Sequence, residues 1–327
     1  MKLSKAFIPT LKETPADAII PSHRLMLRAG MMRQLTAGVY SYLPLGYRAL
    51  TKAMNIVREE MNAIGAQELH LPALNPESLW EKTGRRHVPN FILSIKERDL
   101  VLAPTHEEVI GYIASMHIQS YKDLPQTWYQ IQTKFRNEPR PRSGVLRGRQ
   151  FTMKDSYSLD RSWEDLDASY EAHKEAYKKI FNRCGIKFFI VGASTGAMGG
   201  TGSQEFMIDS EFGEDNTVLC NSCGYAANLE VATSNVAPIG RLEMNEALKE
   251  ISTPNVKTID ELVEFLKVDE TRFAKSLCYR HNKQPILILM TGNDQLNESK
   301  LTAALGGGEI FPINAEELLG LTGADGG

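Results

Sequence analysis

The feature that most constrains the fold is a pair of strand-like runs joined by a basic loop. The first run covers residues 127–138 and the second covers residues 147–157. Two extended runs separated by a loop that contains proline and glycine are typical of an antiparallel hairpin. We therefore expect an antiparallel sheet in this part of the chain.

A long amphipathic helix is expected upstream of the hairpin, over residues 47–64. Its apolar residues recur at helical spacing, and they are Leu50, Ala53, Met54, Val57, Met61 and Ile64. Gly65 can then end the helix in a left-handed conformation, and residues 67–71 predict a strand that Pro72 closes. Helix and antiparallel sheet together indicate an α+β unit.

Shorter elements are expected between this strand and the hairpin. Residues 76–82 predict a helix, and the apolar runs 91–95 and 100–103 flank a polar turn and predict a short hairpin. Thr105 and Glu108 have the spacing of a capping box, which predicts that a helix begins at this point.

A helix after Ser162 carries a histidine on its apolar stripe. The stripe consists of Leu166, Tyr170, His173, Tyr177, Ile180 and Phe181. We therefore interpret His173 as a core residue rather than as a catalyst.

The composition excludes several classes of protein. The 327 residues suffice for two or more domains, and 42% hydrophobic with 24% charged residues is ordinary for a globular chain. The net charge of −3 means that any nucleic-acid partner must be recognised by a local patch. We expect no signal peptide and no membrane span, because no apolar run has the required length. Four scattered cysteines indicate a reducing, cytoplasmic location.

A second, smaller α/β unit is expected towards the end of the chain. The pattern changes near Tyr225, and from about Thr258 it reads as helix, strand, turn, strand and helix. We accordingly divide the chain into residues 1–224 and residues 225–327.

The segment that carries most of the chemistry is KFRNEPRPRSGVLRGRQFTMKD, residues 134–155. A charge run alone favours a solvated basic hairpin. Alternation along strands favours a binding face instead, because Arg136 and Glu138 would share one face, and Arg147 and Phe151 would share the matching face with Arg149. Arginine forks hold phosphate, an aromatic ring stacks on a base and a carboxylate accepts from an exocyclic amine, so this set suits a nucleoside triphosphate.

FRNE followed by a long loop and LRGRQF resembles motif 2 of class II aminoacyl-tRNA synthetases, and the longer string QIQTKFRNEPRPRSGVLRGRQFTMKDSYSL resembles the bacterial-type prolyl-tRNA synthetase family. The resemblance implies an antiparallel class II sheet flanked by helices. It also implies that Arg136 holds the α-phosphate and the amino-acid carboxylate, that Glu138 contacts adenine, that Arg147 holds the terminal phosphate and that Phe151 stacks on adenine.

APTHEEVI, residues 103–110, resembles the proline-binding loop of the same family. The resemblance implies that Thr105 and Glu107 recognise the ammonium of proline, for which a carboxylate is the natural partner. A plain helix cap is the alternative for the tetrapeptide alone. The helix and strand that end at Pro72 resemble motif 1, which builds a homodimer interface in the family, and a core helix is compatible with that role.

The glycine-rich stretch GASTGAMGGTGSQEFM, residues 192–207, resembles a family segment that lines the proline pocket. The family usually has histidine where this chain has Gln204. Cys220 and Cys223 have the spacing of half a zinc site, but a closed site needs about four ligands, so we favour no metal here over the metal and thiol-redox alternatives.

YAANLEVA, TIDELVEFL and FAKSL resemble the editing domain inserted in bacterial prolyl enzymes, and Lys275 matches the family's editing lysine. From the residues alone, an ordinary lysine at a strand edge is the alternative. Editing has a physical motive, because a pocket rejects the smaller alanine only through lost contacts, about 1–3 kcal/mol per methylene.

The implied reaction is attack of the proline carboxylate on the α-phosphorus of ATP, followed by transfer to tRNA(Pro). The expected substrates and partners are proline, ATP with Mg²⁺, tRNA(Pro) and a second copy of the chain. The carboxylate is already a nucleophile, so positioning and charge stabilisation by Arg136, Arg147 and Mg²⁺ would carry catalysis.

Two departures from the family pattern qualify this expectation. We find no motif 3 and no anticodon-binding domain, and the chain ends inside the editing-like unit. We therefore expect residues 1–327 alone not to charge tRNA. A non-catalytic paralogue and a tRNA-binding or editing module are the alternative functions.

Overall fold

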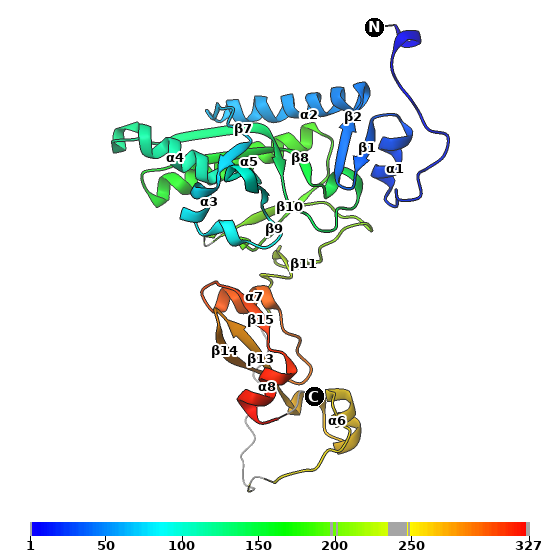
Figure 1. Ribbon diagram of the computed structural model, residues 1–327, viewed down its shortest axis with the longest axis vertical. Coiled ribbons are helices and arrows are strands. Elements are labelled where there is room, and N and C mark those ends of the chain that lie inside the picture. The colour runs from blue at the N-terminus through cyan, green and yellow to red at the C-terminus, as the bar shows by residue number, and fades with distance from the viewer. Residues whose placement is uncertain (1, 197–198, 201, 235–246, 248, 325–327) are drawn as a thin grey trace. The chain divides into compact units, whose positions relative to one another are not determined.

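The computed structural model describes residues 2–196, 199–200, 202–234, 247 and 249–324. The chain divides into two compact units, of which the first comprises residues 1–189 and 208–212 and the second comprises residues 190–207 and 213–327. Figure 1 shows the order of the helices and strands. The boundary that we expect near residue 224 remains a prediction.

A three-stranded sheet with the order β3-β7-β8 forms the centre of the first unit. Its strands are β3 (Gln67–Glu68), β7 (Gln126–Phe135) and β8 (Gln150–Leu159). β7 and β8 pair as an antiparallel hairpin from Gln126 opposite Leu159 to Phe135 opposite Gln150. The expected hairpin is confirmed. However, β7 ends before the basic loop and β8 begins after it, so the expected strand ends at residues 138 and 147 were wrong.

The strand expected over residues 67–71 is only two residues long as a backbone ladder. Beyond this ladder, two glutamine side chains of β7 make hydrogen bonds to the backbone of the segment. The side chain of Gln130 accepts from the Leu71 N–H at 3.1 Å, and the side chain of Gln132 donates to the Leu71 carbonyl at 2.9 Å. Beyond Leu69, whose N–H still donates to the Tyr129 carbonyl at 2.7 Å, the segment is therefore fixed to the sheet by side-chain amides.

Two long helices cover one face of this sheet. They are α2 (Pro44–Ala63) and α5 (Trp163–Arg183). Met61 of α2 and Tyr129 of β7 are buried in one cluster, and Tyr177 of α5 packs against it. Gly65 has φ +81°, the left-handed end expected after α2, and the side chain of Ser162 caps α5 by accepting from the Asp165 N–H.

A second sheet, of order β4-β6-β5, packs with two helices beside the hairpin. The elements are β4 (Leu74–Pro76), α3 (Glu77–Lys82), η2 (Arg85–His87), β5 (Leu93–Ile95), η3 (Lys96–Arg98), β6 (Leu100–Leu102), α4 (Glu107–His117) and η4 (Tyr121–Asp123). Val109 and Ile110 of α4 are buried in a cluster against which Trp128 and Tyr157 pack. Because side chains alternate along a strand, this face of the hairpin is opposite the one that α2 and α5 cover.

The capping box expected at the start of α4 is wrong. The helix begins at Glu107 with His106 at the N-cap position, and no side chain caps it. The side chain of Glu108 is instead bonded to Thr83 and Arg85, which come from another segment.

The N-terminal part of the first unit supports the basic loop. It contains η1 (Leu3–Lys5), α1 (Pro21–Arg28), β1 (Met32–Thr36) and β2 (Val39–Tyr42), and the loop itself contains η5 (Gly144–Leu146). At the β1–β2 turn, Gly38 has φ +75° and its carbonyl accepts from the Arg149 N–H at 2.8 Å. A Cβ at this position would lie 2.7 Å from the Pro141 side chain, so only glycine allows this close approach.

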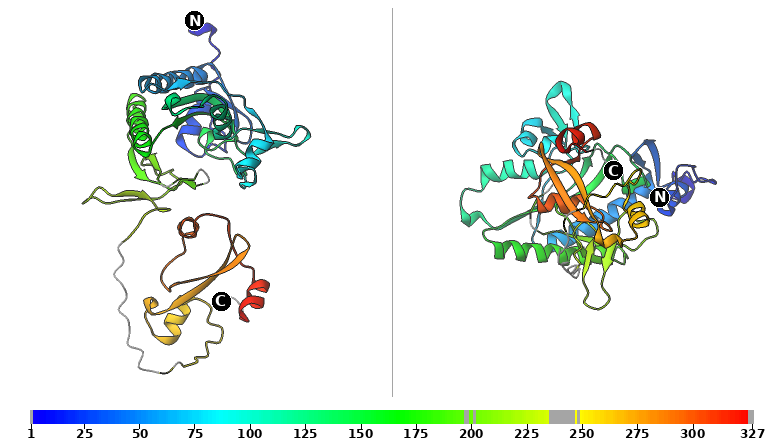
Figure 2. Two further views of the ribbon diagram at one scale, coloured as in Figure 1. Left: turned by 90° about the vertical axis from the view of Figure 1, so that its left-hand side faces the viewer. Right: turned by 90° about the horizontal axis from the view of Figure 1, so that it is seen from below.

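The second unit holds two further sheets, of order β10-β9-β12-β11 and β14-β13-β15. Its elements are β9 (Phe189–Gly192), β10 (Gln204–Met207), β11 (Thr217–Leu219), β12 (Ala226–Asn228), α6 (Ile259–Leu266), η7 (Glu270–Arg272), β13 (Ala274–His281), β14 (Gln284–Thr291), α7 (Glu298–Ala304), β15 (Ile310–Pro312) and α8 (Ala315–Thr322). The expected order of helix, strand, strand and helix from residue 258 onward is confirmed, and Figure 2 shows the β13–β14 hairpin in orange.

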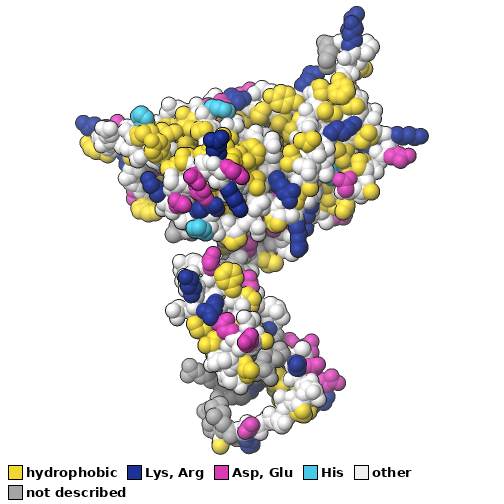
Figure 3. All heavy atoms as spheres, viewed as in Figure 1, with side chains coloured by type: hydrophobic (Ala, Val, Ile, Leu, Met, Phe, Trp, Pro, Cys, Tyr) yellow, Lys and Arg dark blue, Asp and Glu magenta, His cyan; other side chains and the backbone are white. Residues whose placement is uncertain are grey.

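The glycine-rich stretch lies between β9 and β10. Its residues 197, 198 and 201 lie outside the described residues, as do residues 325–327 at the end of the chain. Within the described part of the chain, no helix is long and apolar enough to cross a membrane. Basic and acidic side chains are interspersed on the face shown in Figure 3, in keeping with the net charge of −3.

Candidate active site

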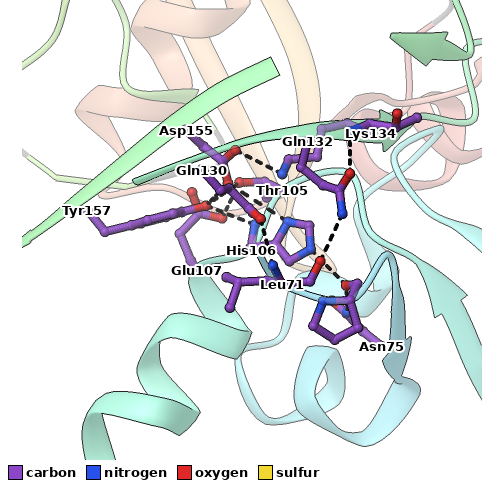
Figure 4. Close-up of polar contacts among 12 residues, drawn as sticks. Leu71, Asn75, Thr105, His106, Glu107, Gln130, Gln132, Lys134, Asp155 and Tyr157 are labelled. Atoms are coloured by element: carbon purple, nitrogen blue, oxygen red, sulfur yellow. Dashed lines mark hydrogen bonds and ion pairs between the residues drawn. The ribbon is translucent and has the colours of Figure 1, made fainter. Parts of the chain in front are cut away.

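Charged and polar side chains gather on the face of the β7–β8 hairpin that α2 and α5 leave uncovered (Figure 4). Gln130 and Asp155 face each other directly in the strand register, as do Trp128 and Tyr157. They share one side of the sheet because side chains alternate along each strand. The hairpin therefore presents a row of buried polar groups to the loop that begins α4.

Asp155 is the hub of this row. Its carboxylate accepts from the Gln130 amide at 2.9 Å and from the Tyr157 hydroxyl at 2.5 Å, and it forms an ion pair with Lys134 at 2.8 Å. Lys134 is completely buried, and burial lowers its pKa while the charges of Asp155 and Glu107 oppose that shift. A buried lysine keeps its charge only with such partners.

Tyr157, which is hydrogen-bonded to Asp155, holds the loop that leads into α4. The Tyr157 hydroxyl accepts from the His106 backbone N–H at 3.0 Å and lies 3.4 Å from the Thr105 hydroxyl. Burial, and then the charges of Glu107 and Asp155, raise the pKa of Tyr157 far above its usual value. His106 is fully buried with its ring Nε2 2.9 Å from the Pro72 carbonyl, and burial followed by Lys134 lowers its pKa.

Solvent still reaches the side chain of Glu107. Its side chain is 35% exposed, and its carboxylate accepts from the Thr105 hydroxyl at 2.6 Å and from Arg85 at 3.1 Å. Thr105 itself is buried. Thr105 and Glu107, both expected site residues, are therefore in direct contact.

Arg136 lies where β7 ends, between two aromatic rings. Its guanidinium carbon is 5.6 Å from the centre of the Phe91 ring and 5.4 Å from the centre of the Phe151 ring. Burial lowers the pKa of Arg136, the charge of Glu107 raises it, and Arg85 lowers it. The structure thus brings Arg136, Phe151, Glu107 and Thr105 into one site, as the sequence predicts.

Arg147 and Glu138 form a second pair at the base of the basic loop. The Arg147 Nε donates to the Glu138 carboxylate at 2.9 Å and holds the pKa of Glu138 below its usual value. The Arg149 Nε also donates to the Glu138 carbonyl at 2.9 Å. These residues lie beyond the strand ends, so the expected sharing of strand faces does not determine their positions.

Several site residues were not singled out from the sequence. They are Arg85, Phe91, Lys134, Asp155 and Tyr157. The strand register, which places Gln130 opposite Asp155, could have indicated this cluster. Two polar side chains that are buried opposite each other in a sheet need hydrogen-bond partners. Nothing in the local sequence points to Arg85, which reaches the site from a separate segment.

The other candidate positions lie in the second unit. Lys275 is in β13 and donates to the Gly292 carbonyl at 3.1 Å. Gln204 begins β10. Cys220 and Cys223 are both free, and among the described residues no group of three or more His, Cys, Asp or Glu side chains could hold a metal ion. His173 contacts Ser156 and the Ser169 carbonyl through its two ring nitrogens, as expected of a structural histidine.

Two segments of the chain match known families of protein domains. Residues 91–238 match the tRNA synthetase class II core domain (G, H, P, S and T), and residues 253–327 match the aminoacyl-tRNA editing domain. The chain is 52% identical over 99% of its length to a proline–tRNA ligase of Caldicellulosiruptor saccharolyticus, and 49% identical over its whole length to proline–tRNA ligase 1 of Anaeromyxobacter dehalogenans. Over almost its whole length the chain is therefore similar to bacterial proline–tRNA ligases, and it matches a class II synthetase core and an editing domain.

The match covers part of each relative. The chain spans 57% of the length of the Caldicellulosiruptor protein and 58% of the Anaeromyxobacter protein. A solved prolyl-tRNA synthetase from Cryptosporidium parvum, complexed with L-proline and AMP, superposes with a TM-score of 0.52 at 17% identity over 60% of this chain and 42% of that one. This likeness shows that the fold is shared. The expected α+β class, a class II core followed by an editing-type domain, is confirmed.

Proposed function

We propose that the polar face of the β7–β8 hairpin binds proline and ATP and forms prolyl-adenylate, the first step of charging tRNA(Pro) with proline. The observation that carries the proposal is the placement of Arg136 beside Glu107. The two side chains offer a half-buried cation and a partly exposed anion that act on each other electrostatically, which matches the two charges of a zwitterionic amino acid.

In this proposal, Glu107 and Thr105 bind the ammonium of proline, and Arg136 binds its carboxylate. The Thr105 hydroxyl already donates to Glu107, so it fixes the direction of the carboxylate that meets the ammonium. Arg136 would also bind the α-phosphate, because a guanidinium fork suits two oxygen acceptors at once. Both reacting groups then contact one arginine.

ATP binding is assigned to the end of the hairpin. Phe151 offers an aromatic ring for adenine, Glu138 a carboxylate for its exocyclic amine, and Arg147 a cation for the terminal phosphate. Arg147 and Glu138 are already paired at 2.9 Å, so the two side chains that we assign to the nucleotide lie side by side. We treat Mg²⁺ as part of the ATP substrate, where it neutralises phosphate charge.

The chemical step is an in-line displacement. A carboxylate oxygen of proline forms a bond to the α-phosphorus, the bond to the bridging oxygen breaks, and pyrophosphate leaves. No side chain has to remove a proton, because the proline carboxylate is already ionised at neutral pH. Arg136 lowers the barrier by stabilising the charge that develops on the phosphate.

A second activity is proposed for the editing-type domain. Residues 253–327 match the aminoacyl-tRNA editing domain, and we propose Lys275, which lies within this range, as its active lysine. We assign to it the hydrolysis of Ala-tRNA(Pro).

We also propose that the protein forms a dimer through α2 and that it is located in the cytoplasm. The inactivity of residues 1–327 alone stays a prediction.

The activity is tested by proline-dependent exchange of labelled pyrophosphate into ATP, measured on the full-length gene product. Proline should support exchange, and a reaction without amino acid should give the background. Alanine should support much weaker exchange, and the other standard amino acids should stay near background. Exchange that is absent with proline, or equally fast with several amino acids, would contradict the proposal.

A further inference from the structure

Arg85 joins two consecutive glutamates of the site from a different part of the chain. One terminal nitrogen of its guanidinium donates to the Glu107 carboxylate at 3.1 Å and to the Glu108 carboxylate at 3.0 Å. Arg85 lies in η2, just after α3, whereas both glutamates lie in the first turn of α4. The contact therefore ties α4 to the neighbouring layer at the candidate ammonium site.

Two aromatic rings lie against this arginine. The guanidinium carbon of Arg85 lies 5.3 Å from the centre of the Trp80 ring and 5.4 Å from the centre of the Phe91 ring. Phe91 also contacts Arg136, so both arginines rest on the same ring. The Arg85 side chain is only 13% exposed, which keeps its two ion pairs from being screened by water as surface pairs are.

The two glutamates differ in what else they can reach. The Glu108 side chain is 1% exposed and also accepts from the Thr83 hydroxyl at 2.9 Å. Glu107 is 35% exposed, and its charge acts on Arg136. Glu108 therefore balances the charge of Arg85, and Glu107 keeps the capacity to pair with an incoming cation.

From this arrangement we infer that Arg85 is a positioning residue, which holds the Glu107 carboxylate in place for the ammonium of the amino-acid substrate. Glu108 prevents Arg85 from neutralising the charge of Glu107 completely. The inference rests on the proposed function. With Arg85 matched to Glu108 and Arg136 matched to Glu107, the four charges cancel, and a zwitterion can enter without leaving an uncompensated charge.

The inference predicts a specific kinetic defect. Without Arg85, the Glu107 carboxylate loses its ion pair, keeps the hydrogen bond from the Thr105 hydroxyl, and can rotate away from the ammonium position. In Arg85→Gln, the KM for proline should rise about ten- to a hundred-fold, the range that one charged hydrogen bond supplies. The KM for ATP should change far less, because the two ion pairs of Arg85 are with Glu107 and Glu108, neither of which is assigned to the nucleotide.

Two further variants separate positioning from simple support of the fold. Arg85→Lys keeps the charge but loses the planar fork between the rings, so its KM for proline should lie between those of the wild type and Arg85→Gln. Glu108→Gln should also raise the KM for proline, because the full charge of Arg85 then falls on Glu107 and competes with the ammonium. Glu108 itself would not touch the substrate.

Arg86→Gln is the matched control. Arg86 is the neighbouring arginine, and it pairs with Glu77 at the other end of α3, away from Glu107. Both KM values should stay near those of the wild type in this variant. Thermal unfolding of all variants shows whether a change in KM follows a loss of stability.

The experiment is the proline-dependent pyrophosphate exchange assay on the full-length gene product, with proline and ATP varied separately. A selective rise of the proline KM in Arg85→Gln, with Arg86→Gln unaffected, supports the inference. Equal rises in both KM values, or kinetics that match those of Arg86→Gln, overturn it. If the wild type itself shows no proline-dependent exchange, the proposed function fails instead, so the two failures are distinguishable.

Discussion

The buried pair of Lys134 and Asp155 allows the sharpest prediction about stability. Asp155→Asn keeps the shape of the side chain and removes the charge that pairs with Lys134, whose side chain has no exposed surface. Breaking a buried ion pair by removing one partner costs about 3–5 kcal/mol. We therefore expect the free energy of unfolding of the first unit to fall by about 3–4 kcal/mol at pH 7.

The neutralisation of Lys134 sets a ceiling on this loss. A lysine with an ordinary pKa of about 10.4 can lose its proton at pH 7 at a cost of about 4.6 kcal/mol, so the penalty cannot exceed that by much. Because the expected loss is smaller than this ceiling, Lys134 keeps its proton at pH 7 and loses it in the folded variant as the pH rises towards 9. The unfolded state then binds more protons, so the stability of the variant should rise with pH, with a slope that approaches about 1.4 kcal/mol per unit near pH 9.

Tryptophan fluorescence during urea unfolding measures the effect in the correct unit. The three tryptophans of the chain, Trp80, Trp128 and Trp163, all lie in the first unit. The double variant Lys134→Met with Asp155→Asn has no buried charge at this point and should recover at least about 1 kcal/mol relative to Asp155→Asn. A loss below about 1 kcal/mol in the single variant, or no dependence on pH, would refute the reasoning.

The remaining predictions concern activity and pH. Arg136→Ala should reduce proline-dependent pyrophosphate exchange by about a hundred-fold or more, the usual effect of losing one preorganised charge contact in a transition state; activity within a few-fold of wild type would show that the phosphate is held elsewhere. Glu107→Ala should weaken proline far more than ATP, and equal rises of both KM values would reject its role. Lys275→Ala should slow hydrolysis of Ala-tRNA(Pro) while leaving pyrophosphate exchange intact, and unchanged hydrolysis would remove Lys275 from the editing site. Burial lowers the pKa of His106 and of His173, so the unfolded state takes up protons first and the urea midpoint should fall from pH 7.5 to pH 6.0; equal midpoints would contradict this.

The hairpin and the long helices could be predicted because local patterns determine them. The stripe from Leu50 to Ile64 has the period of a helix, and Gly65 and Ser162 are end signals that work through their own backbone or side chain. The two strands of the hairpin pair with each other across one loop. Such features depend on residues close in sequence, and the structure confirms them.

The features that sequence analysis missed depend on distant partners. Thr105 and Glu108 have the spacing of a capping box, yet Glu108 bonds to Arg85 and Thr83, because a buried carboxylate gains more from a cation than from a helix end. The strand after Gly65 stops early because glutamine side chains of β7 replace its backbone partners. Neither outcome can be inferred from spacing, since the competing groups come from segments far along the chain.

The candidate site divides in the same way. Thr105, Glu107, Arg136 and Phe151 were recognised through motifs, and the structure places them together. The hub at Asp155 and the contacts of Arg85 became visible only with the fold, because each joins three or more segments. Motifs therefore identified the groups assigned to the substrate, and the fold identified the groups that hold them.

The most direct test of the central claim is a crystal structure of the full-length gene product with a non-hydrolysable prolyl-adenylate analogue. The account predicts the proline nitrogen within hydrogen-bonding distance of Glu107 and Thr105, the phosphate substitute on Arg136, and adenine stacked on Phe151. An analogue bound elsewhere on the chain, or bound here with its amino group directed away from Glu107, would contradict the account.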